Sequence, residues 1–131
     1  MVPRRAFAVP EGLRIAAGLA LLVELGCIAW LATRGGALQS QIQSFFMLGD
    51  TAAHALAFIV AGLTGSLAFR SWRLAFAWLC AVAGGVEIIQ SFDPARTASA
   101  LDFAASLSGV ALGVASGAAL WPATLGRLSR P

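Results

Sequence analysis

Four long apolar segments, separated by short polar connections, dominate the pattern of the chain. They run over residues 12–33, 47–69, 74–92 and 101–123. A helix that rises 1.5 Å per residue needs about 20 residues to cross about 30 Å of hydrocarbon, and each segment approaches or exceeds that length. Because unpaired backbone groups are too costly in lipid, each segment is predicted to be a helix. The expected fold class is therefore all-α: a four-helix transmembrane bundle that forms one domain over residues 1–131.

Residues at the ends of these segments suit helix termini. Pro10 and Glu11 fit the first turn of the first helix, where a missing N–H and a negative charge are both tolerated. Asp50 or Thr51 is expected to cap the second helix, and Ser99 the fourth.

Arginines are distributed unequally between the two faces that four spans define. The chain has nine basic residues, all of them arginine, and seven fall on the side of the termini. Cytoplasmic loops carry an excess of Lys and Arg, so both termini are predicted to lie in the cytoplasm. The seven are Arg4, Arg5, Arg14, Arg70, Arg73, Arg127 and Arg130, whereas Arg34 and Arg96 lie on the opposite side.

Composition supports a bilayer environment. Hydrophobic residues make up 59% of the chain, charged residues only 11%, and the mean hydropathy is +0.82. The net charge of +3 forms no basic stripe with interleaved aromatics, so nucleic-acid binding is not expected. Cys27 and Cys80 lie inside apolar runs without a CxxC or Cys/His spacing, which predicts that they behave as small hydrophobes in the hydrocarbon. No cofactor is expected.

Polar and ionisable residues gather toward the face opposite the termini. They occur in pairs spaced i, i+3 or i, i+4, so each pair shares one helix face. Together with one loop arginine, they lie within about two helical turns of the membrane surface. The set is Asp50 and His54 in the second helix, Glu87 and Gln90 in the third, Arg96 in the following loop, and Asp102 and Ser106 in the fourth helix.

Snorkelling and helix capping explain some of these positions but not all of them. They account for Asp93 and, equally well as a functional role, for Asp50. They account poorly for Glu87, which lies about five residues inside an apolar run, because an intramembrane carboxylate is costly unless paired. His54, the only histidine, also lies within its span. The set is therefore interpreted as a buried network or a ligand site.

Glu24 stands apart near the middle of the first helix. It lies about 18 Å from the cytoplasmic end of that helix at 1.5 Å per residue. A carboxyl group at this depth is protonated, paired with a neighbouring helix or partner subunit, or part of a proton or substrate path. The sequence leaves a structural and a functional role equally open.

Small residues recur every four positions on two helices. Such stripes let a second backbone approach closely. They are predicted to form contacts within the bundle, with homodimerisation as the weaker alternative. The stripes are Gly109, Gly113 and Gly117 in the fourth helix, and Ala53, Ala57, Ala61 and Gly65 in the second.

The order and spacing of these residues resemble the VanZ-like family of short bacterial multi-pass membrane proteins. The chain carries D-x-x-x-H at Asp50, E-x-x-Q at Glu87, the following Arg96, and D-x-x-x-S-x-x-G-x-x-x-G from Asp102. The match covers about residues 49–117. In the family pattern an asparagine stands at the position of Ser106, so a single hydroxyl replaces an amide here.

The resemblance implies a protein of the bacterial cytoplasmic (inner) membrane, in a family linked to resistance to the glycopeptide teicoplanin. The first hypothesis is a site for a lipid or lipid-linked head group, in which Arg96 binds phosphate or carboxylate and His54 and Glu87 exchange protons. The alternative is a structural accessory subunit that packs against partner membrane proteins. A small transporter that uses Glu24 is less favoured, because no broken helix or inverted repeat is evident.

Enzymatic chemistry is not favoured, because no nucleophile elbow, phosphate loop or metal-ligand motif appears. One histidine with two or three carboxylates could bind a divalent ion. A neutralised network beside Arg96 argues against this, so no metal is expected.

Overall fold

A computed structural model describes residues 9–33, 41, 44, 49–93 and 99–128, with the backbone alone described for 122–128. Within this part the chain is helical, and four helices are long and apolar enough to cross a membrane. They are α1 (Glu11–Thr33), α3 (Asp50–Ala68), α4 (Trp72–Ser91) and α5 (Ala100–Leu128). The prediction of an all-helical chain with four helices of this length and hydropathy is confirmed.

The observed helix limits follow from local backbone geometry. Pro10 accepts the first bond of α1 from the Arg14 N–H at 3.0 Å, and Glu11 in the first turn pairs with Arg14. Helix α3 ends where Phe69 becomes extended, and Ser71 is extended immediately before α4. The connection between α3 and α4 is therefore only three residues long, which makes the two helices antiparallel neighbours.

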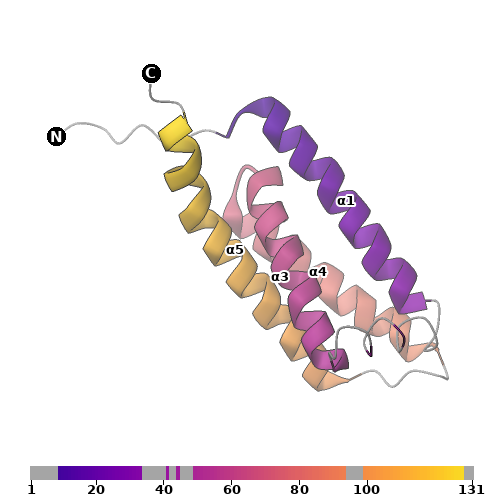
Figure 1. The fold of residues 1–131 in the computed structure, drawn as a ribbon. Helices are drawn as coiled ribbons and strands as arrows, with labels where there is room; N and C mark the ends of the chain where they lie inside the picture. Colours follow the sequence, from indigo (N-terminus) through magenta and orange to yellow (C-terminus); the bar gives the residue numbers. More distant parts are fainter. Residues whose placement is uncertain (1–8, 34–40, 42–43, 45–48, 94–98, 129–131) are drawn as a thin grey trace.

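Helix α3 occupies the centre of the bundle and contacts the other three helices (Figure 1). Its most extensive contact is with α5, and α1 packs mainly on α3. Helix α1 begins and α5 ends at one end of the bundle, together with the α3–α4 connection (Figure 1). We call the opposite end, where α3 and α5 begin and α4 ends, the cluster end.

Glycines bring α3 and α5 into backbone contact. A Cβ on Gly113 would collide with the Ile59 carbonyl oxygen and would lie 2.9 Å from Gly62 Cα. A Cβ on Gly109 would likewise collide with the Ala55 carbonyl oxygen. At Gly109, Gly113 and Gly117 alike, an added Cβ would meet atoms of α3, so this face of α5 lies against α3 within the bundle.

The alanine stripe of α3 only partly follows its prediction. Ala61 and Gly65 are buried, but an added Cβ on Gly65 would meet Leu79 of α4 at 3.1 Å. Gly62, one position away from the stripe, makes the close approach to α5. The central helix packs against partners on several sides, so more than one of its faces needs small residues.

Hydrogen bonds at the end of the bundle opposite the cluster end also join α5 to α3. The Trp121 indole N–H of α5 donates to Ser66 Oγ at 2.7 Å and to the Leu63 carbonyl oxygen at 3.2 Å, both on α3. Elsewhere large apolar side chains point outward, as expected of a surface that faces lipid. Examples on α1 are Leu19, Leu22 and Val23.

The close contact makes a prediction about two glycines of the same protein. Gly113→Ala should force α3 and α5 apart and destabilise the bundle by about 1–3 kcal/mol, the usual cost of overpacking. Gly85→Ala is the matched control, because an added Cβ there meets nothing within 4 Å. Thermal unfolding in detergent should show a lower midpoint for Gly113→Ala only. Equal midpoints for the two variants would contradict the packing described above.

Candidate functional site

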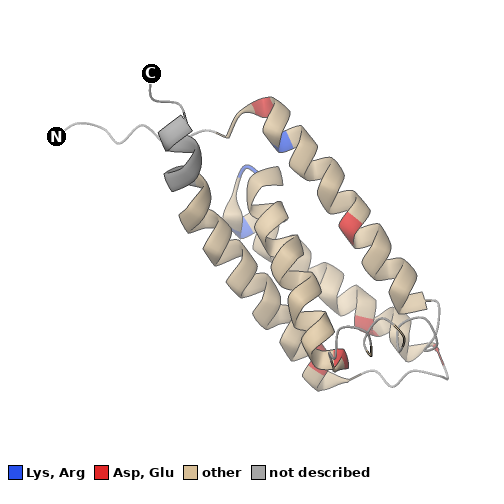
Figure 2. Cartoon of the chain, viewed as in Figure 1, with Lys and Arg blue, Asp and Glu red and all other residues tan. Residues whose placement is uncertain are grey.

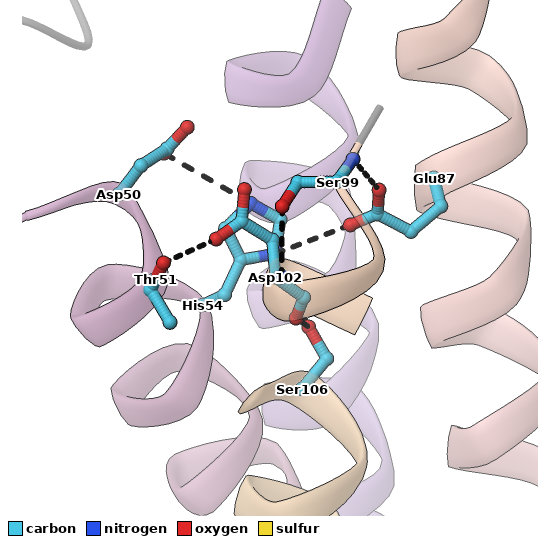
Figure 3. A network of polar contacts seen from close by, with 7 residues as sticks. All are labelled: Asp50, Thr51, His54, Glu87, Ser99, Asp102 and Ser106. Atoms are coloured by element: carbon cyan, nitrogen blue, oxygen red, sulfur yellow. Dashed lines mark hydrogen bonds and ion pairs between the residues drawn. The ribbon is translucent and has the colours of Figure 1, made fainter. Parts of the chain in front are cut away.

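A polar cluster joins α3, α4 and α5 at the cluster end of the bundle (Figure 3). Its members are Asp50 and His54 of α3, Glu87 of α4, and Asp102 and Ser106 of α5, with Thr51 and Ser99 bonded to them. The predicted convergence of three helices is therefore observed for these five positions. The close packing of α3 on α5 explains it, since Ser106 precedes Gly109 by about one turn and Asp102 precedes it by about two.

His54 lies at the centre of the polar cluster. Its Nδ1 is 3.1 Å from Ser106 Oγ and 3.8 Å from Glu87 Oε1. Its Nε2 is 4.0 Å from Asp50 Oδ1, beyond ordinary hydrogen-bond range. The two ring nitrogens therefore face different partners, and the side chain is only 9% exposed.

The Ser106 hydroxyl determines which ring nitrogen carries a proton. Ser106 Oγ donates to the Asp102 carbonyl oxygen at 2.9 Å and has no second proton to give. While it donates this bond, it can only accept from His54, and this arrangement places the proton of a neutral ring on Nδ1. In the neutral ring, Nε2 then carries the lone pair.

Glu87 is held by one carboxylate oxygen only. Its Oε2 accepts from the Ser99 backbone N–H at 3.2 Å. Its Oε1 is buried, has no hydrogen-bond partner among the described residues, and lies 3.8 Å from His54 Nδ1. A buried acceptor without a partner lowers the free energy of unfolding by about 1–3 kcal/mol, so the position of Glu87 Oε1 destabilises the fold.

Asp102 is fixed from two sides. Thr51 Oγ1 of α3 donates to Asp102 Oδ1 at 2.5 Å, and the Asp102 backbone N–H donates to Ser99 Oγ at 3.3 Å. The residue is buried, whereas the side chain of Asp50 is 44% exposed. The polar cluster thus extends from a buried histidine to a carboxylate at the surface.

Two expectations about helix caps have different outcomes. Ser99 caps α5 as predicted, through its bond to the Asp102 N–H. The expectation that Asp50 or Thr51 caps α3 is wrong, because Gly49 holds the N-cap position and no side chain makes a cap bond. Thr51 instead lies inside the helix, where its hydroxyl donates to the Asp102 carboxyl group of α5.

Two members of the predicted set do not enter the polar cluster as described. Gln90 is buried in the last turn of α4, but the described hydrogen bonds do not link its side chain to His54. Arg96 lies outside the described residues, as does Arg34. Among the described residues, the cluster end carries acidic groups, and Arg14, Arg70 and Arg73 lie toward the other end (Figure 2).

Glu24 is separate from the polar cluster and pairs with the neighbouring helix. Thr64 Oγ1 of α3 donates to Glu24 Oε1 at 2.9 Å, which fits one of the alternatives left open for Glu24, pairing with a neighbouring helix. Glu24 Oε2 is buried and has no hydrogen-bond partner among the described residues. Glu24 thus helps to hold α1, the least buried of the four long helices, against α3.

Sequence reasoning missed three polar partners. Thr51 was considered only as a cap, Ser99 was not linked to Glu87, and Thr64 was not linked to Glu24. The spacing from Thr51 to His54 is i, i+3, which places both on one face of α3 and could have signalled the first. The other two contacts depend on how helices rotate against each other, which spacing along one helix does not reveal.

Comparison with protein-family models, with curated proteins and with solved structures finds no match for this chain. The VanZ-like resemblance therefore stays a prediction from its motif residues.

Proposed function

We propose that this chain is a multi-pass membrane protein of the cell envelope whose polar cluster binds the head group of a lipid or lipid-linked molecule. The observation that carries the proposal is the change of exposure along the cluster. The His54 side chain is 9% exposed, whereas Asp50, one helical turn nearer the cluster end, is 44% exposed. A polar ligand at the membrane face would have a path of hydrogen-bonding groups from Asp50 inward to His54.

Each residue has a role in this proposal. His54 and Glu87 exchange protons or hydrogen bonds with the ligand, because an imidazole and a carboxyl group can each donate and accept. Asp102, fixed by Thr51, keeps the α5 side of the site in place. Arg96, placed near this face by the sequence, would bind a phosphate or carboxylate of the ligand. The VanZ-like resemblance, with its link to teicoplanin resistance, supports an envelope role.

The proposal predicts loss of a co-purifying lipid when the central histidine is removed. Lipids retained by the protein after gentle detergent extraction from bacterial membranes are quantified by mass spectrometry. His54→Ala should retain the enriched lipid class about 10- to 100-fold less, the range expected for losing one or two hydrogen bonds to a charged group. Ser91→Ala is the control, because this exposed serine at the same end bonds only its own helix.

Equal lipid retention in His54→Ala and Ser91→Ala would contradict head-group binding. A His54→Ala protein that loses thermal stability but keeps its lipids would favour the accessory-subunit alternative. That alternative further predicts a second, stoichiometric protein chain in native mass spectra of the extracted wild type.

We further propose that the bundle end opposite the cluster end, where α1 begins and α5 ends, faces the cytoplasm. The seven-to-two distribution of arginines supports this orientation. In a Cys27→Ser, Cys80→Ser background, a membrane-impermeant maleimide added to intact spheroplasts should label Asp93→Cys but not Ser71→Cys. Asp93 follows α4 at the cluster end and Ser71 lies in the α3–α4 connection, so the two positions report opposite faces. Labelling of Ser71→Cys alone would reverse the orientation.

A further inference from the structure

Three potential metal ligands meet between α3 and α5 at the cluster end. Asp50, His54 and Asp102 each offer one ligand atom, and these atoms all lie within 4.8 Å of one another. We infer that the two aspartate carboxylates and His54 Nε2 form a binding site for a divalent transition-metal ion. The inference does not depend on the proposed lipid ligand, because it concerns the protein alone.

The state of the histidine provides the first argument. Ser106 Oγ accepts a hydrogen bond from His54 Nδ1–H, because the Ser106 hydroxyl donates its own hydrogen to the Asp102 carbonyl oxygen. Nε2 is left with a lone pair and makes no hydrogen bond to the described residues; it lies 4.0 Å from Asp50 Oδ1. Two electron-rich atoms facing each other at this distance are stabilised by a cation between them. Metal ions bind the unprotonated imidazole nitrogen, so the ring is already in the required tautomer.

Glu87 provides the second, independent argument. In metal sites a ligating histidine commonly donates its other N–H to a carboxylate, which orients the ring and makes the ligand nitrogen more basic. Within the described part of the chain, Glu87 Oε1 is buried without a hydrogen-bond partner and lies 3.8 Å from His54 Nδ1 (Figure 3). Its other oxygen is fixed by the Ser99 N–H. A small rotation of the ring would place Nδ1–H between Ser106 and Glu87, so that Glu87 Oε1 would accept a hydrogen bond from the histidine.

The distances suit an ion after modest side-chain movement. With bonds of about 2.1 Å, neighbouring ligand atoms are roughly 3.0–3.5 Å apart. The present spacing of up to 4.8 Å requires a contraction of about 1–2 Å. The Asp50 carboxylate would have to supply most of this movement by reorienting when the ion binds; it lies in the first turn of α3 and its side chain is 44% exposed. Asp102 is already positioned by Thr51.

The donor set selects the class of ion. One imidazole and two carboxylates favour zinc, manganese or ferrous iron over calcium or magnesium, which prefer oxygen ligands alone. A dipositive ion also balances the two aspartates. Three protein ligands leave at least one coordination position open, which water or a ligand oxygen can fill.

Zinc binding to the purified, chelator-treated protein in detergent tests the inference. Isothermal titration should show one saturable Zn²⁺ site per chain, with much weaker binding of Ca²⁺. His54→Gln and Asp102→Asn should each weaken Zn²⁺ binding by more than tenfold, and Glu87→Gln by about 10- to 100-fold as a positioning residue. Asp93→Asn is the control, because it removes an acid from the same end without removing a ligand. Equal Zn²⁺ and Ca²⁺ affinities, or equal losses in Asp93→Asn and His54→Gln, would overturn the site.

X-ray absorption by the zinc-loaded wild type provides a readout that does not depend on any variant folding. The expected spectrum shows a first shell of nitrogen and oxygen with the outer-shell scattering of one imidazole. Sulfur scattering would assign the ion to Cys27 or Cys80 and overturn the inference, as would an oxygen-only shell. Zinc binding without lipid retention, or lipid retention without zinc binding, separates this inference from the proposed function.

Discussion

The close contact between α3 and α5 is the interaction on which the rest of the structure depends. Without a hydrophobic driving force between helices in lipid, association requires close packing and hydrogen bonds across the interface. The glycines of α5 allow its backbone to touch α3 along several turns. The same approach carries the polar start of α5 to the polar start of α3. Asp102 thereby reaches Thr51, and Ser106 reaches His54. The packing and the polar cluster are therefore two parts of one interface.

The buried polar groups lie at two levels along the bundle. Near the middle of α1, Glu24 accepts one hydrogen bond from Thr64, which is one of several contacts that join α1 to α3. At the cluster end, His54 lies within 4.0 Å of Asp50, Glu87 and Ser106, which come from three helices. Glu24 and Glu87 each keep one buried carboxyl oxygen without a hydrogen-bond partner among the described residues. The number of polar groups around His54, and not an unpaired oxygen, therefore distinguishes the polar cluster.

Much of this architecture was predictable because it is written in local patterns. Length and hydropathy determine the four helices, and the i, i+4 spacing places Asp50 and His54 on one face of α3. The glycine stripe of α5 predicts a close neighbour. The partners across helices were harder, because they depend on the rotation of each helix about its axis. The N-cap of α3 was predicted at the wrong residue, because the helix begins one position earlier than expected: Gly49 is the N-cap, and Thr51 lies inside the helix and donates to Asp102.

The tautomer of His54 tests the central claim most directly, because the polar cluster assigns a role to each ring nitrogen. As this is the only histidine in the chain, ¹⁵N-histidine labelling yields the signals of one ring. In a metal-free sample at about pH 8, nitrogen NMR should show a protonated Nδ1 and an unprotonated Nε2. Ser106→Ala should remove this preference. A proton on Nε2 in the wild type would contradict both the hydrogen-bond assignment and the cation site built on it.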